Sequence, residues 1–315
     1  SNNQASKGAA IYQNGGSLVV QKATFESNNA GNGVLTTEGG TATVNESSFK
    51  TNTASGNGGA IVAQGSARLS VTKTEFVGNG AVNGGAIALA GLSGNAHGIV
   101  GNLFEANTVS GDGGALHTSA ANTAALDNNV FYQNKALSGE GGALYLGASA
   151  GQVSAHHNTM VANEANIGGA ASSANSQLLL NNNLIAGNTA SNKGANLNIA
   201  SGVVAGSQYN LIGESGNAGI EGATPTSTTT PSVSVEKVVE LQLGYEGGDG
   251  YFSSMRTMPI IGGGPARDMI AEGDCAVATD MRGEVRPDTK SANDGAASCD
   301  PGAYEFTVLS CVEDA

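Results

Sequence analysis

The chain has 315 residues, 48 of them glycine, with only 12% charged residues and a formal net charge of −13. This acidic balance excludes a basic nucleic-acid footprint, because phosphates would be repelled. No apolar run reaches the roughly 18 residues of a membrane-spanning helix, so none is predicted.

A motif of Gly-Gly-Ala followed by an aliphatic residue recurs along the first two-thirds of the chain. Complete and degenerate copies follow one another at intervals of 25 to 29 residues. They begin at Gly8, Gly33, Gly58, Gly84, Gly113, Gly141, Gly168 and Gly194. A fixed period of this length is the signature of a repeat protein. The chain opens inside a repeat, so we expect further sequence upstream of Ser1.

A second motif runs in phase with the first. In each interval a hydrophobic residue, usually phenylalanine, is followed three positions later by asparagine. These asparagines are Asn28, Asn52, Asn79, Asn107, Asn134, Asn163 and Asn188. Asparagine tolerates left-handed backbone, and its amide can bond to equivalent amides above and below. We therefore predict a structural asparagine ladder.

The period, the short β-favouring runs and the lack of a helical pattern indicate a parallel β-solenoid. We predict an all-β fold, a right-handed parallel β-helix of about eight coils, because parallel crossovers are almost always right-handed. Each coil should contain two or three strands of about four to six residues. The paired glycines should supply left-handed backbone or allow close approach of neighbouring coils.

These repeats resemble those of chlamydial-type polymorphic outer-membrane proteins and, more widely, of bacterial right-handed parallel β-helix surface proteins. The resemblance covers residues 1–213. It implies the β-helix fold and an extracellular or cell-surface setting in a bacterium. It does not imply one activity, since such scaffolds serve as adhesins, lyases and structural proteins.

Charge divides the chain into regions. Residues 1–213 carry 7 Lys or Arg against 9 Asp or Glu, whereas residues 214–315 carry 6 against 17. We predict β-helix repeats over 1–213, an irregular loop or linker over 214–236, and a loop-rich cap over 237–315. The cap should cover the open end of the rod, because exposed strands invite edge pairing.

The C-terminal region resembles the ending of the choice-of-anchor Q family. The matching motifs are Asp-Met-Arg-Gly-Glu-Val-Arg-Pro at 280–287 and Cys-Asp-Pro-Gly-Ala-Tyr-Glu-Phe at 299–306. Pro301 and the long insert 288–298 depart from the family pattern. The resemblance implies a secreted bacterial β-helix protein. It also implies structural pairs that hold the cap, formed by Asp280, Arg282, Arg286, Asp300 and Glu305.

Three cysteines occur, all in the C-terminal region. Cys275 and Cys299 flank the Arg-Gly and Arg-Pro motifs, and in the secreted setting that the resemblance implies we predict a disulfide between them. Cys311 is then left over: it could be a free thiol, pair with a missing segment, or replace one partner in the bridge.

Catalytic and metal-binding residues are thinly spread. Asp112 and Asp127, the two aspartates of the repeats, occupy different places in their coils, and we expect Glu140, like the other glutamates, on a solvated outer face. His156 and His157 cannot jointly bind one ion from an extended strand, because adjacent side chains point to opposite faces. We predict no metal and no cofactor, although the acidic C-terminal loops leave bound Ca²⁺ open as an alternative.

One outward stripe is a candidate binding surface. If Ile61 and its equivalents face the core, the next residue of each coil faces out. The stripe contains Tyr12, Val62, Ala88, His117, Tyr145 and Ser172. Tyrosines on a flat β face can stack on sugar rings, so the stripe could bind a glycan or a protein. The alternative is a set of ordinary outward residues partly covered by a neighbouring loop.

The sequence favours a non-enzymatic, exported bacterial protein that binds glycans or proteins at a surface, or self-associates into filaments. The alternative is a polysaccharide lyase or glycoside hydrolase. A cluster of Asp, Arg or Lys in one groove would favour the enzyme. A bare polar face with end-to-end contacts would favour assembly.

Overall fold

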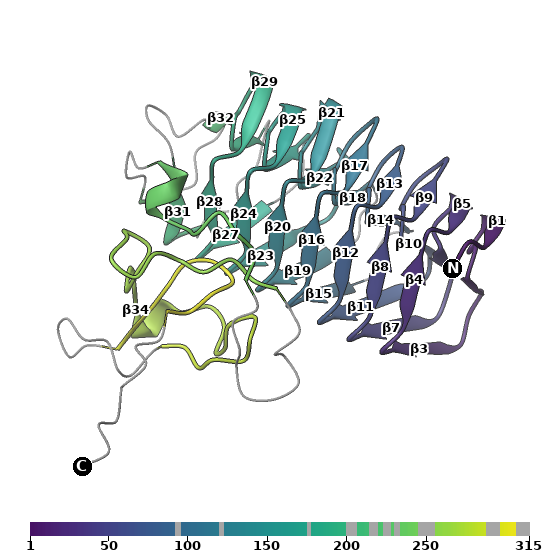
Figure 1. Cartoon of the computed structure of the whole chain (residues 1–315), viewed down its shortest axis with the longest axis horizontal. Helices are drawn as coiled ribbons and strands as arrows, with labels where there is room; N and C mark the ends of the chain where they lie inside the picture. Colours follow the sequence, from purple (N-terminus) through teal and green to yellow (C-terminus); the bar gives the residue numbers. More distant parts are fainter. Residues whose placement is uncertain are drawn as a thin grey trace, which may run out of the picture.

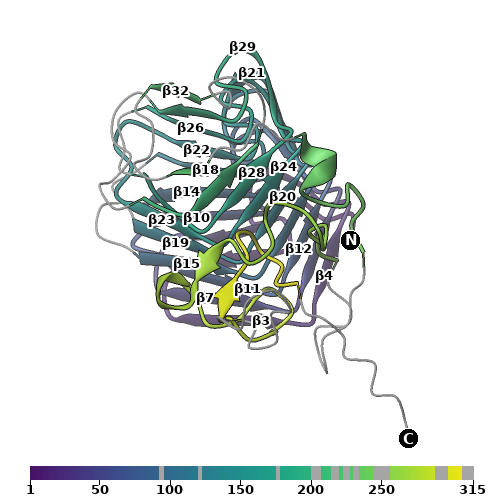
Figure 2. The same cartoon turned by 90° about the vertical axis from the view of Figure 1, so that its left-hand side faces the viewer.

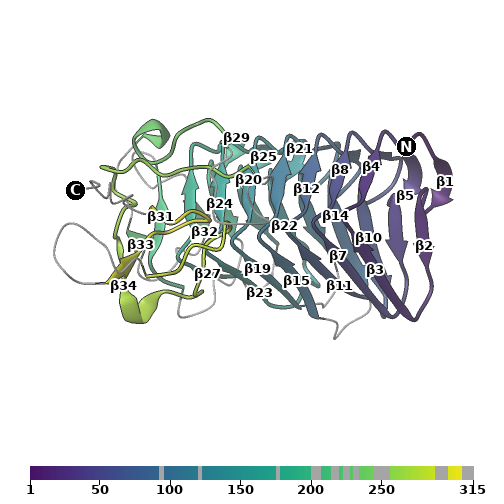
Figure 3. The ribbon, with the colours of Figure 1, turned by 60° about the horizontal axis from the view of Figure 1, so that its bottom comes forward.

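The protein is a rod of stacked short strands with a strand-poor C-terminal segment against one flank, as seen in a computed structural model (Figure 1). The structure describes residues 1–91, 96–119, 123–174, 178–199, 207–213, 220–222, 228–229, 234–244, 256–287 and 297–306. Four parallel sheets, here called A to D, run along the rod (Figure 3). Each turn visits them in that order, and the seven strands of sheet C correspond to about seven complete turns.

The strands are short, and their bounds follow the repeat. Sheet A contains β1 (Gln4–Lys7), β5 (Asn29–Asn32), β9 (Thr53–Ala54), β13 (Gly80–Ala81), β17 (Thr108–Val109), β21 (Lys135–Glu140), β25 (Glu164–Ile167) and β29 (Thr189–Lys193). Sheet B contains β2 (Ile11–Gln13), β6 (Leu35–Thr37), β10 (Ile61–Gly65), β14 (Ile87–Gly91), β18 (Leu116–Thr118), β22 (Leu144–Leu146), β26 (Ala171–Ser173), β30 (Leu197–Ile199) and β32 (Ile220–Gly222).

The other two sheets complete each turn. Sheet C contains β3 (Ser17–Gln21), β7 (Thr41–Asn45), β11 (Arg68–Thr72), β15 (Ala96–Val100), β19 (Thr123–Asp127), β23 (Val153–His156) and β27 (Leu178–Asn181). Sheet D contains β4 (Thr24–Glu26), β8 (Ser48–Lys50), β12 (Glu75–Val77), β16 (Leu103–Glu105), β20 (Val130–Tyr132), β24 (Thr159–Val161), β28 (Leu184–Ala186), β31 (Asn210–Ile212) and β33 (Thr228–Thr229). A turn therefore holds four strands, rather than the two or three predicted, because left-handed corner residues divide the coil more finely.

The core is built from equivalent residues of successive turns. Five phenylalanines of sheet D, the hydrophobic residues of the second motif, stack with ring centroids 4.5 to 5.2 Å apart. They are Phe25, Phe49, Phe76, Phe104 and Phe131. The aliphatic residues that follow the glycine motif align on sheet B, where Ile61 pairs with Leu35 and Ile87. Burial of these two rows supplies the main apolar stabilisation of the rod.

The asparagines of the second motif form a hydrogen-bonded ladder at the corner between sheets D and A. The backbone N and Nδ2 of Asn79 both donate to Asn107 Oδ1, each at 3.0 Å. Asn107 Nδ2 donates to the Phe76 carbonyl at 3.0 Å and to Asn134 Oδ1 at 2.9 Å. The same pattern links Asn28, Asn52, Asn79, Asn107, Asn134, Asn163 and Asn188. It satisfies polar groups that the stacked coils bury.

A second asparagine ladder, which the sequence analysis missed, lies at the corner between sheets C and D. It consists of Asn102, Asn129, Asn158, Asn183 and Asn210. Each stands two residues before the core residue of sheet D, so the signal was present in the sequence. In earlier turns Ser47 and Thr74 occupy this corner, and the Thr74 backbone N donates to Asn102 Oδ1 at 2.9 Å.

The two glycines of the repeated motif have different roles. The first turns the chain from sheet A into sheet B with left-handed backbone, as at Gly113 with φ of 68°. The second glycine packs directly against the backbone of the next coil. A Cβ on Gly114 would fall 2.0 Å from the Gly142 carbonyl oxygen and 2.7 Å from the Lys135 backbone nitrogen. Both predicted reasons for glycine therefore apply, at successive positions.

The C-terminal segment packs along a flank of the rod. Its buried side chains include Val238, Met258, Ile260, Met281 and Tyr304, which form one apolar cluster with Leu103, Val130, Val161 and Leu184 of sheet D. Figure 2 shows the segment, in green and yellow, beside β20, β24 and β28. The described contacts of the segment cover the outer face of sheet D, and the cap over the open end stays a prediction.

The segment contains little regular structure. Its elements are η1 (Val235–Lys237), η2 (Glu272–Asp274) and the antiparallel pair β34 (Ile270–Ala271) and β35 (Ser298–Cys299). Cys275 and Cys299 form a disulfide, whereas Cys311 lies outside the described residues. Strands β32 and β33, which pair with β30 and β31, fall within 214–236, so part of the region predicted as linker continues the sheets.

Candidate functional site

The predicted outward stripe is the outer row of sheet B. Its members pair in register from turn to turn: Tyr12, Thr36, Val62, Ala88, His117, Tyr145, Ser172 and Asn198. Tyr12 is 48% exposed, and His117 and Tyr145 are half-buried. Val62, Ala88 and Ser172 are buried, which corrects the expectation that the whole stripe is accessible.

The corner between sheets A and B explains this uneven burial. The first glycine of each motif lies over the outward residue of its own turn. A Cβ on Gly58 would fall 2.6 Å from Val62 Cγ2, and one on Gly168 would fall 2.9 Å from Ser172 Cβ. Short outward side chains are therefore shielded by the corner, whereas the longer rings of His117 and Tyr145 reach past it.

His117 and Tyr145 form a stacked pair on adjacent turns. Their ring centroids are 5.3 Å apart and the planes are inclined by 19°. Burial lowers the pKa of His117, with the neighbouring Asp112 carboxylate opposing that shift. Burial, followed by the carboxylates of Asp112 and Glu140, raises the pKa of Tyr145. At neutral pH the pair is therefore an uncharged imidazole beside an intact phenol.

Two carboxylates border this pair at equivalent positions of their turns. Asp112 directly precedes Gly113, and Glu140 directly precedes Gly141. The Glu140 backbone N donates to Asp112 Oδ1 at 2.8 Å. Glu140 is therefore not one of several scattered glutamates, as the sequence analysis treated it, but stands one turn above Asp112 in the same corner.

The polar cluster continues into the next two turns. Ser172 Oγ donates to Glu140 Oε2 at 2.6 Å, and Asn198 Nδ2 donates to Ser172 Oγ at 3.0 Å. We call Asp112, His117, Glu140, Tyr145, Ser172 and Asn198 together the sheet B cluster. It offers two stacked, half-buried rings and two carboxylates along one face, while the buried Ser172 and Asn198 hold Glu140 in place through hydrogen bonds. Such a set can bind a polyhydroxylated ligand.

The N-terminal part of the same face holds a separate network around Glu38. Its carboxylate accepts bonds from Lys7 Nζ at 2.6 Å, from Tyr12 Oη at 2.6 Å and from Gln64 Nε2 at 2.5 Å. These donors, Lys7 first, lower the pKa of Glu38 to about 2. Tyr12 is thus held by a satisfied surface network and is not joined to the His117–Tyr145 pair.

The structural pairs that the C-terminal resemblance implies form a buried network. Asp280 lies at the centre of its first part. Asp280 Oδ1 accepts the backbone N of Arg282 at 2.7 Å and of Gly283 at 3.0 Å. Asp280 Oδ2 accepts Arg282 Nε at 2.7 Å and the Glu305 backbone N at 3.0 Å. The Arg282 guanidinium lies 3.7 Å from the centre of the Tyr304 ring.

Arg286 connects the C-terminal segment with the rod through hydrogen bonds and a buried contact. Its buried guanidinium donates to the carbonyls of Asp300 at 2.6 Å and Gly302 at 2.7 Å, and it contacts Nδ1 of His157. It also lies 3.6 Å from Glu305 Oε2. Burial, followed by the Arg286 charge, holds the pKa of His157 well below 6.5. Burial raises the pKa of Asp300 to about 6.

These bonds leave the C-terminal acids with structural partners. Asp300 Oδ1 accepts the Asp268 backbone N, and Oδ2 accepts the Phe306 backbone N, each at 2.6 Å. Within the described ranges, no group of three or more His, Cys, Asp or Glu side chains is arranged to hold a metal ion. Asp288 and Asp294, two aspartates of the acidic C-terminal loops, lie outside those ranges.

His156 and His157 occupy different environments. His156 is on the outside of sheet C, with Nδ1 2.8 Å from Asp127 Oδ1. His157 is at a left-handed corner, φ 50°, and is buried under the C-terminal segment. The prediction that they point apart agrees with this arrangement, but His157 is a buried contact and not a surface residue.

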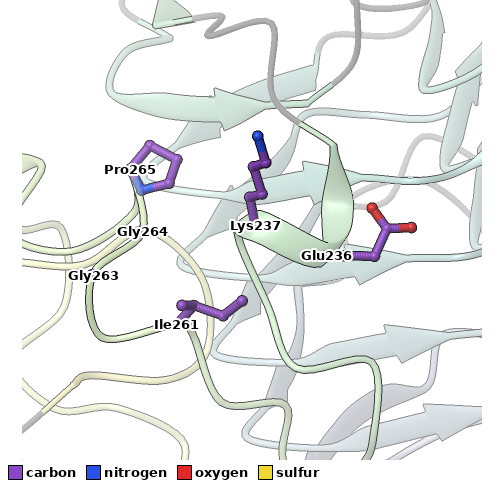
Figure 4. A pocket seen from close by; sticks show the side chains of 6 residues that line it. All are labelled: Glu236, Lys237, Ile261, Gly263, Gly264 and Pro265. Carbon is purple, nitrogen blue, oxygen red and sulfur yellow. The ribbon is translucent and has the colours of Figure 1, made fainter.

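One open hollow lies between η1 and the turn that follows Ile261 (Figure 4). Glu236, Lys237, Ile261 and Pro265 line it with two glycines. The two charged side chains are exposed and of opposite sign. The residues that line the hollow do not combine aromatic rings with carboxylates as the sheet B cluster does, so we do not treat the hollow as the functional site.

Comparisons with known proteins identify the fold family. Residues 1–160 match a family described as a right-handed β-helix region. The comparison with curated proteins and that with solved structures gave no match. Along the described residues, no helix is long and apolar enough to cross a bilayer. The family match covers half of the chain and agrees with the stacked parallel sheets, so the chain belongs to the right-handed β-helix family.

Proposed function

We propose that this is an exported bacterial cell-surface or extracellular-matrix protein that binds a glycan through the sheet B cluster without cleaving it. The stacked, half-buried His117–Tyr145 pair carries the proposal. Aromatic faces beside hydrogen-bonding groups are the usual means of holding sugar rings. The bacterial and extracellular setting rests on the repeat and C-terminal resemblances described above.

The charges of the cluster argue against a lyase acting on uronates. Such an enzyme needs a cation to neutralise the substrate carboxylate and a base beside it. Among the described residues, no lysine or arginine forms an ion pair with Asp112 or Glu140. A second acidic group, such as a uronate, would be repelled there.

A glycoside hydrolase is the second candidate, and one observation favours it. Asp112 and Glu140 stand in one corner on adjacent turns, which are about 4.8 Å apart in a parallel sheet. Hydrolases use two carboxyl groups about 5 to 9.5 Å apart. Against this role, each carboxylate already accepts a structural hydrogen bond, from the Glu140 backbone N and from Ser172 Oγ respectively.

A glycan array and a reducing-end assay on the same polysaccharides separate these functions. We expect binding without new reducing ends. Tyr145→Ala should reduce binding at least tenfold, because it removes one of the stacked rings. Tyr12→Ala is the matched control: it removes an exposed tyrosine of the same row outside the cluster and should bind like wild type. New reducing ends that disappear in Glu140→Gln would replace the proposal by the hydrolase.

A further inference from the structure

The corner that carries Asp112 and Glu140 has a regular structural use along the rod. In each turn the residue before the first glycine accepts a backbone bond from the glycine one turn earlier. Gly58 N donates to Asn83 O at 2.9 Å, Gly84 N to Asp112 O at 3.0 Å, and Gly113 N to Glu140 O at 2.9 Å. The corner residues are thus strict equivalents.

Asparagine satisfies this corner in the earlier turns. Asn32 Oδ1 accepts the Asn57 backbone N at 2.9 Å, and Asn83 Oδ1 accepts the Asp112 backbone N at 2.8 Å. Asp112 Oδ1 makes the same bond to Glu140 N at 2.8 Å. A neutral amide therefore suffices for the fold here, and the corner bond does not require a negative charge at 112.

The two carboxylates lie in the same two turns as the aromatic pair. Asp112 belongs to the turn of His117, and Glu140 belongs to the turn of Tyr145. In the next turns the corner residues are Ile167 and Lys193. Two like charges on adjacent turns repel each other, and within the described residues no cation neutralises them. The cost of placing them together is offset when a positive ligand lies between them.

We infer that the sheet B cluster binds a glycan with free amino groups, such as a chain of β-linked glucosamine. This inference rests on the proposed glycan binding and names its ligand class. The sugar ring packs against the outer edges of the stacked Tyr145 and His117 rings, and its ammonium group pairs with Asp112 and Glu140. A lysine-rich peptide could satisfy the carboxylates but would leave the apolar edges of the two rings uncovered.

The test compares four probes by calorimetry in mildly acidic, low-salt buffer containing a chelator. They are a glucosamine hexasaccharide, its fully N-acetylated form, a galacturonate hexasaccharide and hexalysine. We expect the glucosamine oligomer to bind most tightly and its affinity to fall with salt. The double variant Asp112→Asn, Glu140→Gln should lose about tenfold in affinity for it and nothing for the acetylated form.

Controls keep the outcome interpretable. Asp112→Asn retains the corner bond that Asn83 already makes, so misfolding is not expected. Glu164→Gln removes a partly exposed carboxylate of sheet A that pairs with Lys135, outside the cluster, and should leave affinity unchanged. Equal binding of both glucosamine forms, unaffected by the double variant, would overturn the amino-sugar inference while leaving glycan binding intact. Tighter binding of hexalysine or of galacturonate, or no binding of either glucosamine form, would also overturn it.

Discussion

Replacing Asn107 by alanine tests the asparagine ladder at its centre. The substitution removes the acceptor shared by the backbone N and Nδ2 of Asn79, and it removes the donor to the Phe76 carbonyl. All these groups are buried, and an orphaned buried polar group costs about 1–3 kcal/mol. After partial relaxation we expect Asn107→Ala to lower the free energy of unfolding by about 4 kcal/mol.

Urea unfolding of Asn107→Ala should be compared with that of Asn29→Ala. Asn29 is an exposed asparagine on β5, so its replacement should cost less than about 0.5 kcal/mol. Hydrogen exchange at the Asn79 amide gives a local readout, and exchange there should accelerate. If Asn107→Ala and Asn29→Ala unfold within about 1 kcal/mol of each other, the ladder does not hold the coils together as argued.

Further predictions concern the aromatic core, the contact between neighbouring coils, the buried residue His157 and the Cys275–Cys299 disulfide. Phe104→Ala should cost about 3–5 kcal/mol by calorimetry, since it opens a gap in the aromatic stack; an unchanged melting temperature would contradict it. Gly114→Ala should destabilise the rod more than alanine at the open position Gly98, because only Gly114 meets backbone atoms. His157→Asn should lower the free energy of unfolding at pH 7.5. Below pH 6.5 this loss should shrink by about 1.4 kcal/mol per pH unit, because the lowered pKa of folded His157 makes the wild type lose stability as pH falls. A loss independent of pH would refute this. Reducing the Cys275–Cys299 bridge should cost about 3 kcal/mol in the C-terminal segment, for a sequence separation of 24; proteolysis that does not accelerate there would count against it.

The repeat itself was predictable because stacking makes the same demand at every turn. Phe104 and Asn107 recur at one spacing, since a ring must stack on a ring and an amide must meet an amide. The second ladder was overlooked because its corner tolerates Ser47 and Thr74 in early turns, so asparagine becomes regular only from Asn102 onward.

The docking of the C-terminal segment depends on contacts between distant parts of the sequence. The outward residue before each core phenylalanine is Ser48 or Glu75 in early turns, then Leu103 and Val130. This change from polar to apolar marks where sheet D is covered. The sequence contains the signal, but its meaning emerges only when the turns are aligned.

The candidate site was predicted in part. Alternation along sheet B correctly placed His117 and Tyr145 on one outer row, because side chains alternate strictly in a strand. It could not foresee that Val62 is buried, since a corner glycine of the same turn covers it. Asp112 and Glu140 escaped notice because they differ in residue type, although both precede the first glycine of the motif.

The most direct test of the central claim observes the imidazole rings during ligand binding. The chain has four histidines, so their NMR signals can be resolved and His117 assigned from His117→Gln. On titration with a glycan that binds on the array, we expect a shift of the His117 ring signals. Those of buried His97 and His157, and of His156 beside Asp127, should stay in place. Saturable binding that shifts only His156, or no histidine, would place the ligand elsewhere and contradict the account.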